Sequence, residues 1–217
     1  NSDKFLNNMG LMNEYNLIVK NVITDTQNST TYKDNSDTTI SSLLEYNSSY
    51  PMKKETDKYR NILKPQASIR FGTNQVMNNK NKDQRSSIED IYSLNRSGST
   101  TSLEEGISLT YGAKFEKTEK NNLEKNLLNF ELANILRLEE NEKSSRNSGL
   151  DEKISDVFGK IEYNPTDMIK FNYDFSVKNN FNQQNYEFLS TEFKVNNFLT
   201  TFEYLNEENT FDKESYL

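Results

Sequence analysis

The sequence predicts an all-β protein, and more narrowly an antiparallel transmembrane β-barrel that contributes about nine to ten strands to a larger barrel. Two observations support this prediction. Apolar and polar residues alternate in several segments, and the connections between these segments alternate between shorter and longer. The alternation is clearest at residues 157–163 and 169–177, where it is typical of strands with one apolar and one polar face. All 217 residues are expected to form one partial barrel domain.

A hairpin turn is predicted between these two segments. Residues 164–167 read Asn-Pro-Thr-Asp. Asn is common at the first position of a β-turn, and Pro already has the backbone angle that the second position requires. The two segments therefore form a hairpin with a nearly uninterrupted apolar side.

Further strands are predicted from the same alternation, at residues 13–25, 40–50, 62–72, 107–115, 189–195 and 198–204, with a shortened strand at 211–217. Pro65 is expected near the start of its strand, because proline removes one hydrogen bond of the ladder. Residues 123–140 are ambiguous. Their Leu and Glu content favours a helix, while the apolar residues at every second position from Leu128 to Leu138, interrupted by Asn134, fit a strand equally well.

The connections differ in length in a regular way. Shorter ones are expected around 51–61, 117–123, 164–167 and 195–198, and longer ones around 26–39, 73–103, 140–153, 178–185 and 206–212. Outer-membrane barrels have short periplasmic turns and long extracellular loops. Segment 73–103 is therefore expected to be a long extracellular loop. The predicted strand lengths also suit tilted strands that cross a bilayer in about 9–11 residues.

In the predicted strands at 62–72, 107–115 and 169–177, charged residues keep to one face. A Lys or Arg that faces lipid at mid-depth costs about 2–4 kcal/mol, so the charged face is expected to line a wet lumen. The lumen-facing candidates are Lys64, Arg70, Lys114, Lys160, Lys170 and Asp174. A soluble β-sandwich with an adhesive function would also have one face free of charge, and this alternative stays open.

The composition excludes several kinds of chemistry. The chain has neither Cys nor His, so thiol chemistry, disulfides, imidazole bases and common zinc sites are absent. No enzymatic activity and no cofactor are expected, and a hydrolase barrel is disfavoured for lack of a base. The net charge of −7 argues against nucleic acid as a partner. Because the chain starts at Asn1 without Met, it is expected to be a processed chain or a fragment.

Several short sequences resemble one known family. Residues 91–96 (Ile-Tyr-Ser-Leu-Asn-Arg) and 104–112 (Glu-Glu-Gly-Ile-Ser-Leu-Thr-Tyr-Gly) resemble the F-S-L-N-R … E-G-G … Y-G segment of the lipopolysaccharide-assembly family LptD. Residues 148–160 are similar to the S-G-L … S-D-Y-V-G-R/K segment of that family. Tyr163-Asn164-Pro165 and the segment 172–176 follow in the expected order. The resemblance covers at least residues 93–178.

The resemblance implies an outer-membrane barrel that receives lipopolysaccharide from a periplasmic bridge and delivers it to the outer leaflet. It implies a lipoprotein plug, LptE, in the lumen, and it favours a strand at 123–140. The cysteines and the periplasmic jelly-roll domain of the family have no counterpart in this sequence. The residues that match family motifs, without an assigned role, are Ser93, Leu94, Asn95, Arg96, Glu105, Gly106, Ser148, Gly149, Leu150, Ser155, Asp156 and Gly159.

Two motif segments have a structural interpretation beside the functional one. Residues 93–96 could contact a plug or a sugar, or fold inward and order the long loop. Ser155 and Asp156 begin a strand and could cap the loop through an Asx-type hydrogen bond. For the whole chain, the alternative function is that of another outer-membrane barrel, a porin or translocator that passes solutes through its lumen.

Overall fold

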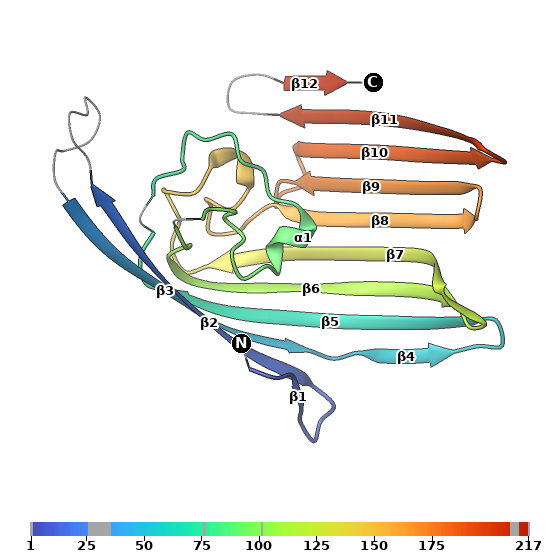
Figure 1. Ribbon diagram of the computed structural model, residues 1–217, viewed down its shortest axis with the longest axis horizontal. Coiled ribbons are helices and arrows are strands. Elements are labelled where there is room, and N and C mark those ends of the chain that lie inside the picture. The colour runs from blue at the N-terminus through green and yellow to red at the C-terminus, as the bar shows by residue number, and fades with distance from the viewer. Residues whose placement is uncertain (1, 26–35, 76, 101, 209–212, 217) are drawn as a thin grey trace.

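The computed structural model describes residues 2–25, 36–75, 77–100, 102–208 and 213–216, which form one antiparallel β-sheet (Figure 1). Eleven strands lie side by side in sequence order, and the short strand β4 pairs with β5 beside β3. The strands are β1 (Phe5–Leu6), β2 (Met12–Asp25), β3 (Ser36–Ser49), β4 (Met52–Glu55), β5 (Tyr59–Gly72), β6 (Gly106–Glu119), β7 (Asn122–Arg137), β8 (Val157–Thr166), β9 (Ile169–Val177), β10 (Gln184–Val195), β11 (Phe198–Glu208) and β12 (Lys213–Tyr216).

The sheet is open. Within the described ranges, β1 pairs with β2 alone and β12 with β11 alone, so its two ends do not meet. The all-β antiparallel prediction is confirmed, while closure into a barrel stays a prediction. The strand number exceeds the predicted nine to ten, because β1 and β4 have only two and four residues and are too short for a visible alternation. The shortened strand predicted at 211–217 corresponds to β12. None of the helices in the described segments is long and apolar enough to cross a membrane.

One face of the sheet, here called the apolar face, is formed by residues that pair directly across neighbouring strands. One row of this face consists of Leu63, Phe115, Phe130, Ile161, Tyr173 and Leu189. Many of its large side chains are more than a third exposed, among them Ile69, Phe71, Ile107, Leu109, Tyr111, Phe130 and Leu189. An exposed apolar surface of this extent marks an interaction with lipid or another apolar partner.

The opposite face, here called the polar face, carries charges in the same regular way. One row across β5 to β9 consists of Lys64, Lys114, Glu131, Lys160 and Asp174. Because side chains alternate between the two faces along a strand, Arg70 and Lys170 also lie on this face. All six lumen-facing candidates therefore share one face, although whether that face lines a lumen stays a prediction.

The connections at the two ends of the strands differ in length (Figure 1). At one end of the strands the connections are two-residue turns, which join β6 to β7 (120–121), β8 to β9 (167–168) and β10 to β11 (196–197). At the other end of the strands lie the long connections 73–105 and 138–156. The predicted alternation of connection lengths is confirmed, and Asn196, with φ 54°, takes the left-handed conformation that a tight turn requires. Most of the predicted loop 26–39 lies outside the described residues, and its last four residues belong to β3.

Two turn predictions were wrong in position. Residues 51–61 are mostly strand, because β4 and the start of β5 pair around a turn at 56–58. Pro65 therefore lies in the middle of β5 and not near its start. It faces the interruption between β3 and β4, where its carbonyl accepts a hydrogen bond from the Tyr50 amide at 2.9 Å. A proline is tolerated there because the neighbouring strand is itself interrupted.

The hairpin turn between β8 and β9 is also displaced. Asn164 and Pro165 lie within β8, where the pairing with β9 shifts between Tyr163 and Thr166. This irregularity accommodates a proline in a ladder, and the turn itself consists of residues 167–168. Segment 122–137 is a strand paired with β6 and β8, so the helical alternative is excluded.

Candidate functional site: a loop cap on the polar face

Two long connections fold onto the polar face near one end of the strands (Figure 1). The first, residues 73–105, contains the short helix α1 (Ile88–Ile91), and the second, residues 138–156, contains the 3₁₀ turn η1 (Arg146–Ser148). We call their described residues together the loop cap. Segment 73–103 was predicted to be a loop. In the structure its short helix α1 lies against β7 and β8.

An apolar cluster fixes α1 on the sheet. Ser87 and Asp90 form a capping box at its N-terminus, which compensates for unpaired backbone amides. Ile88 and Ile91 are buried and pack with residues of β7, β8 and the second loop. The cluster consists of Ile88, Ile91, Ala133, Ile135, Leu150 and Phe158, with Tyr92 against it. Family-motif residue Leu150 is therefore part of this core.

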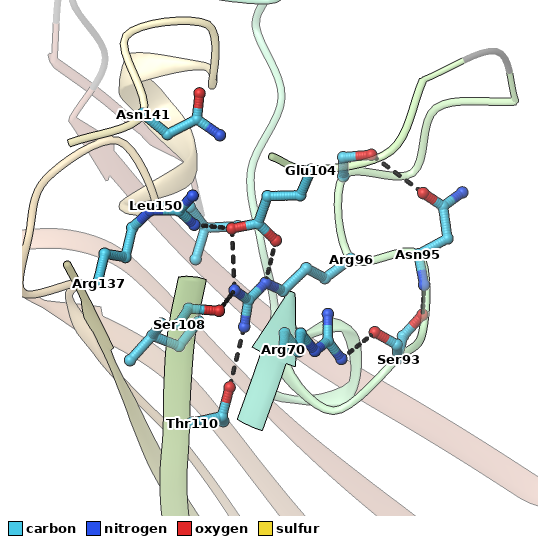
Figure 2. Close-up of polar contacts among 12 residues, drawn as sticks. Arg70, Ser93, Asn95, Arg96, Glu104, Ser108, Thr110, Arg137, Asn141 and Leu150 are labelled. Carbon is cyan, nitrogen blue, oxygen red and sulfur yellow. Dashed lines mark hydrogen bonds and ion pairs between the residues drawn. The ribbon is translucent and has the colours of Figure 1, made fainter. Parts of the chain in front are cut away.

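Arg96 lies at the centre of a buried polar network (Figure 2). Its guanidinium forms an ion pair with both oxygens of Glu104, and it donates hydrogen bonds to Ser108 at 2.7 Å and Thr110 at 2.9 Å. Only 2% of Arg96 is exposed. Burial lowers the pKa of Arg96 to about 9, so the side chain remains a cation at neutral pH. The loop thus returns to strand β6 through a charged, planar contact.

Two arginines from the strands extend this network. Arg137 pairs with Glu104 and donates a hydrogen bond to the Glu105 carbonyl at 2.6 Å. Arg70 pairs with Glu45 at 2.5 Å and donates to the Ser93 carbonyl at 2.5 Å. Three arginines therefore meet two carboxylates, and one loop carbonyl each accepts a hydrogen bond from Arg70 and Arg137. Removal of either carboxylate would leave an uncompensated buried positive charge.

The two loops also bind each other. Asn141 donates to the side-chain oxygen of Gln75 at 2.8 Å, and the Lys143 ammonium pairs with Glu105 at 2.9 Å. The Ser145 hydroxyl donates to the Lys82 carbonyl at 2.6 Å. The two loops are consequently bonded into one structural unit.

The Lys143–Glu105 contact predicts a pH dependence of the loop cap. The pKa of Glu105 lies below its ordinary value of 4.5: burial acts against this shift, but hydrogen bonds from Lys143 and the Gln75 amide outweigh it. A carboxylate with a lowered folded-state pKa stabilises the fold above its unfolded pKa, and this contribution is lost as the pH falls below about 4.5. Because the pair is about one-third exposed, we expect it to contribute less than about 1 kcal/mol to the free energy of unfolding.

Hydrogen exchange of residues 138–150 should rise from pH 6 to pH 3 relative to the intrinsic rate. Glu105→Gln should flatten this profile, and an unchanged profile would contradict the assignment.

Asp156 joins the second loop to β9 and β10. Its carboxylate accepts hydrogen bonds from Ser176 at 2.8 Å and Asn185 at 2.6 Å, so it does not act through the predicted Asx-type cap. Ser155 instead accepts from the Ile135 amide at 2.9 Å. Gly149 has φ +66°, and a Cβ there would lie 2.6 Å from the Asp156 carboxylate, so only glycine fits.

The loop cap reaches a strand near each lateral edge of the sheet. The Lys20 ammonium of β2 donates to the Ser99 carbonyl at 2.8 Å. On the other side, Arg85 pairs with Glu207 of β11 at 3.1 Å and donates to the Glu208 carbonyl at 3.3 Å. One loop therefore contacts strands that lie far apart in the sheet.

The structure brings together many of the residues selected from the sequence. Ser93, Asn95, Arg96, Glu105, Ser148, Gly149, Leu150, Ser155 and Asp156 take part in the loop cap, with Leu94 in the same loop and Gly106 at the start of β6. Gly159 lies apart, on the apolar face, where the Phe175 ring covers it. Sequence reasoning missed Glu45, Glu104 and Arg137. Their only local signal was a charge at a strand or next to a motif, which is too common to be selective.

These contacts describe a structural site, in which buried ion pairs and hydrogen bonds hold the loop cap on the sheet. Among the residues that the structure describes, no group of three or more His, Cys, Asp or Glu side chains is arranged to hold a metal. The geometry defines an antiparallel β-sheet wall with an exposed apolar face and a polar face that carries folded loops, as is typical of outer-membrane transport proteins.

The family comparison identifies the chain more narrowly. The family model described as "LptD: LPS transport system D" matches residues 8–216, and the chain belongs to this family. Its members are transport and assembly proteins of the outer membrane. The curated proteins contain no match to this chain.

Proposed function

We propose that this chain forms part of the wall of an outer-membrane β-barrel that delivers lipopolysaccharide to the outer leaflet. The observation that carries the proposal is the separation of an exposed apolar face from a charged face, in a chain matched by the family model over residues 8–216. In the proposal the apolar face contacts lipid and the polar face lines the lumen. The open ends of the sheet must then be paired, because unpaired backbone groups are costly in lipid.

The proposed orientation in the membrane follows from the different lengths of the connections at the two ends of the strands. The two-residue turns 120–121, 167–168 and 196–197 lie at the periplasmic side, and the loop cap lies at the extracellular side, within the upper part of the lumen. Lipopolysaccharide would arrive from periplasmic bridge components. The lipoprotein LptE would occupy the lumen below the cap, against the row that runs from Lys64 to Asp174.

Photocrosslinking from two adjacent residues of β9 tests this orientation. Lys170 lies on the polar face and Phe171 on the apolar face. We expect a photoreactive residue at 170 to capture LptE or lipopolysaccharide, and one at 171 to capture phospholipid. The reverse pattern would overturn the face assignment. Capture of neither LptE nor lipopolysaccharide from 170 would overturn the proposed function and favour a porin that passes solutes.

A charge on the apolar face should be costly in the membrane. Leu132 lies in the middle of β7 on this face, opposite Ala113 and Gly159. We expect Leu132→Arg to reduce the free energy of unfolding in lipid by about 2–4 kcal/mol. Asn172→Arg on the half-buried polar face is the matched control and should cost much less. Denaturant titration of the protein in phospholipid vesicles measures both, and equal losses would contradict a lipid-facing apolar face.

A further inference from the structure

A cavity of about 260 Å³ lies between the start of α1 and the polar face of β9 and β10. Ser86 and Glu89 line it from the loop cap, and Asp174, Tyr186 and Phe188 line it from the sheet. Tyr186 and Phe188 share the polar face with Asp174, because Phe188 pairs directly with Asp174 and Tyr186 with Ser176. Two aromatic rings of β10 thus lie on the polar face, which also carries Phe158 and Ile135 of the apolar cluster under α1.

The lining combines the two kinds of group that recognise a polyhydroxylated ring. Aromatic rings offer a rigid apolar surface for the C–H groups of such a ring. The carboxylates of Glu89 and Asp174 are acceptors only and suit ligand hydroxyl donors. An apolar surface with a few placed polar groups is the usual composition of a small-ligand site.

The charges around the cavity argue against a phosphate. The Lys160 ammonium already pairs with Glu89, with Glu162 at 3.2 Å, and lies 4.0 Å from Asp174. Arg85, next to Ser86, pairs with Glu207 at 3.1 Å. A phosphate would therefore approach the Glu89 and Asp174 carboxylates without an uncommitted cation to receive it, whereas a neutral sugar would not be repelled.

We propose that this cavity is a binding site for a neutral sugar ring of the saccharide that the protein carries. The inference rests on the proposed function, since it assigns one part of the lipopolysaccharide molecule to one place on the polar face. The phosphorylated part of that molecule would pass elsewhere. The site would hold a sugar beneath α1 while the loop cap remains in place.

Saturation-transfer NMR on the full-length protein in detergent tests the site, with maltotriose as the neutral probe and glucose 1-phosphate as the charged one. We expect saturation of maltotriose and a weaker effect on glucose 1-phosphate. Asp174→Asn should raise the dissociation constant for maltotriose about tenfold, the loss of one hydrogen bond to a charged group. Phe188→Leu should raise it about three- to tenfold. Phe193→Leu, on the apolar face of the same strand, is the matched control and should leave it unchanged.

Each outcome decides between the alternatives. Absence of maltotriose binding, equal binding by all variants, or tighter binding of glucose 1-phosphate would overturn the sugar site. Labelling of lipopolysaccharide at the cell surface separates this result from the proposed function. If the unsubstituted protein delivers lipopolysaccharide but binds no neutral sugar, the inference alone fails. If maltotriose binds through Asp174 and Phe188 but delivery is absent, the proposed function fails and the site remains.

Discussion

Replacement of Arg96 by Ala is expected to release the loop cap from the sheet and to cost about 3–5 kcal/mol of stability, because it removes a buried ion pair of Glu104 and the donor to the Ser108 and Thr110 hydroxyls. Amides of residues 93–105 and 138–150 should lose hydrogen-exchange protection together, since the two loops are bonded to each other. Arg96→Lys should recover little of the loss, because an ammonium cannot reproduce the planar contact with Glu104, Ser108 and Thr110.

The control for this experiment is an ion pair at the surface. Lys53 pairs with Glu55 at 2.7 Å, but its side chain is 51% exposed. Lys53→Ala should therefore change stability by at most about 1 kcal/mol. If Arg96→Ala leaves the protection of both loops unchanged, the buried network does not hold the cap.

Phe158→Ala is expected to have a comparable effect, about 3–5 kcal/mol. Phe158 is 1% exposed and lies in the apolar cluster under Ile88 and Ile91, so its loss would leave a cavity beneath α1. Thermal unfolding in detergent measures the change in the whole protein, and hydrogen exchange at residues 86–92 measures the local release of the helix.

Phe181→Ala is the matched control for this substitution. Phe181 is 73% exposed in the connection between β9 and β10, where its ring contributes little to burial. Its replacement should change the unfolding temperature only slightly. Equal destabilisation by the two substitutions would show that the cluster under α1 is not a core.

The strands were predictable because their signal is local. Alternation in β5, β6, β8 and β9 depends only on which residues follow one another, and the register then follows from short turns. The positions of β4 and of the turn at 167–168 were not predictable, because prolines at 51 and 165 lie beside irregular pairings instead of in turns. A proline in the sequence does not reveal whether the neighbouring strand is interrupted.

The loop cap was predictable only in its location. Arg96 and Asp156 stood out through their motif segments, but their partners come from distant strands and loops. Phe158 shares its parity in β8 with Lys160 and Glu162, and Ile88 and Ile91 occur in a largely polar segment. The helix and the strand face bury each other, and neither local pattern indicates the other. Contacts of this kind depend on tertiary structure and cannot be derived from periodicity.

The contacts of Lys20 and Arg85 have a mechanical consequence. They join one loop to β2 and to β11, so the sheet cannot flatten between these strands without breaking hydrogen bonds and an ion pair. The bending stiffness of this part of the wall is then determined by the loop as well as by the strands. A relative with a shorter connection between β5 and β6 would have the same strand pairing but a more compliant wall.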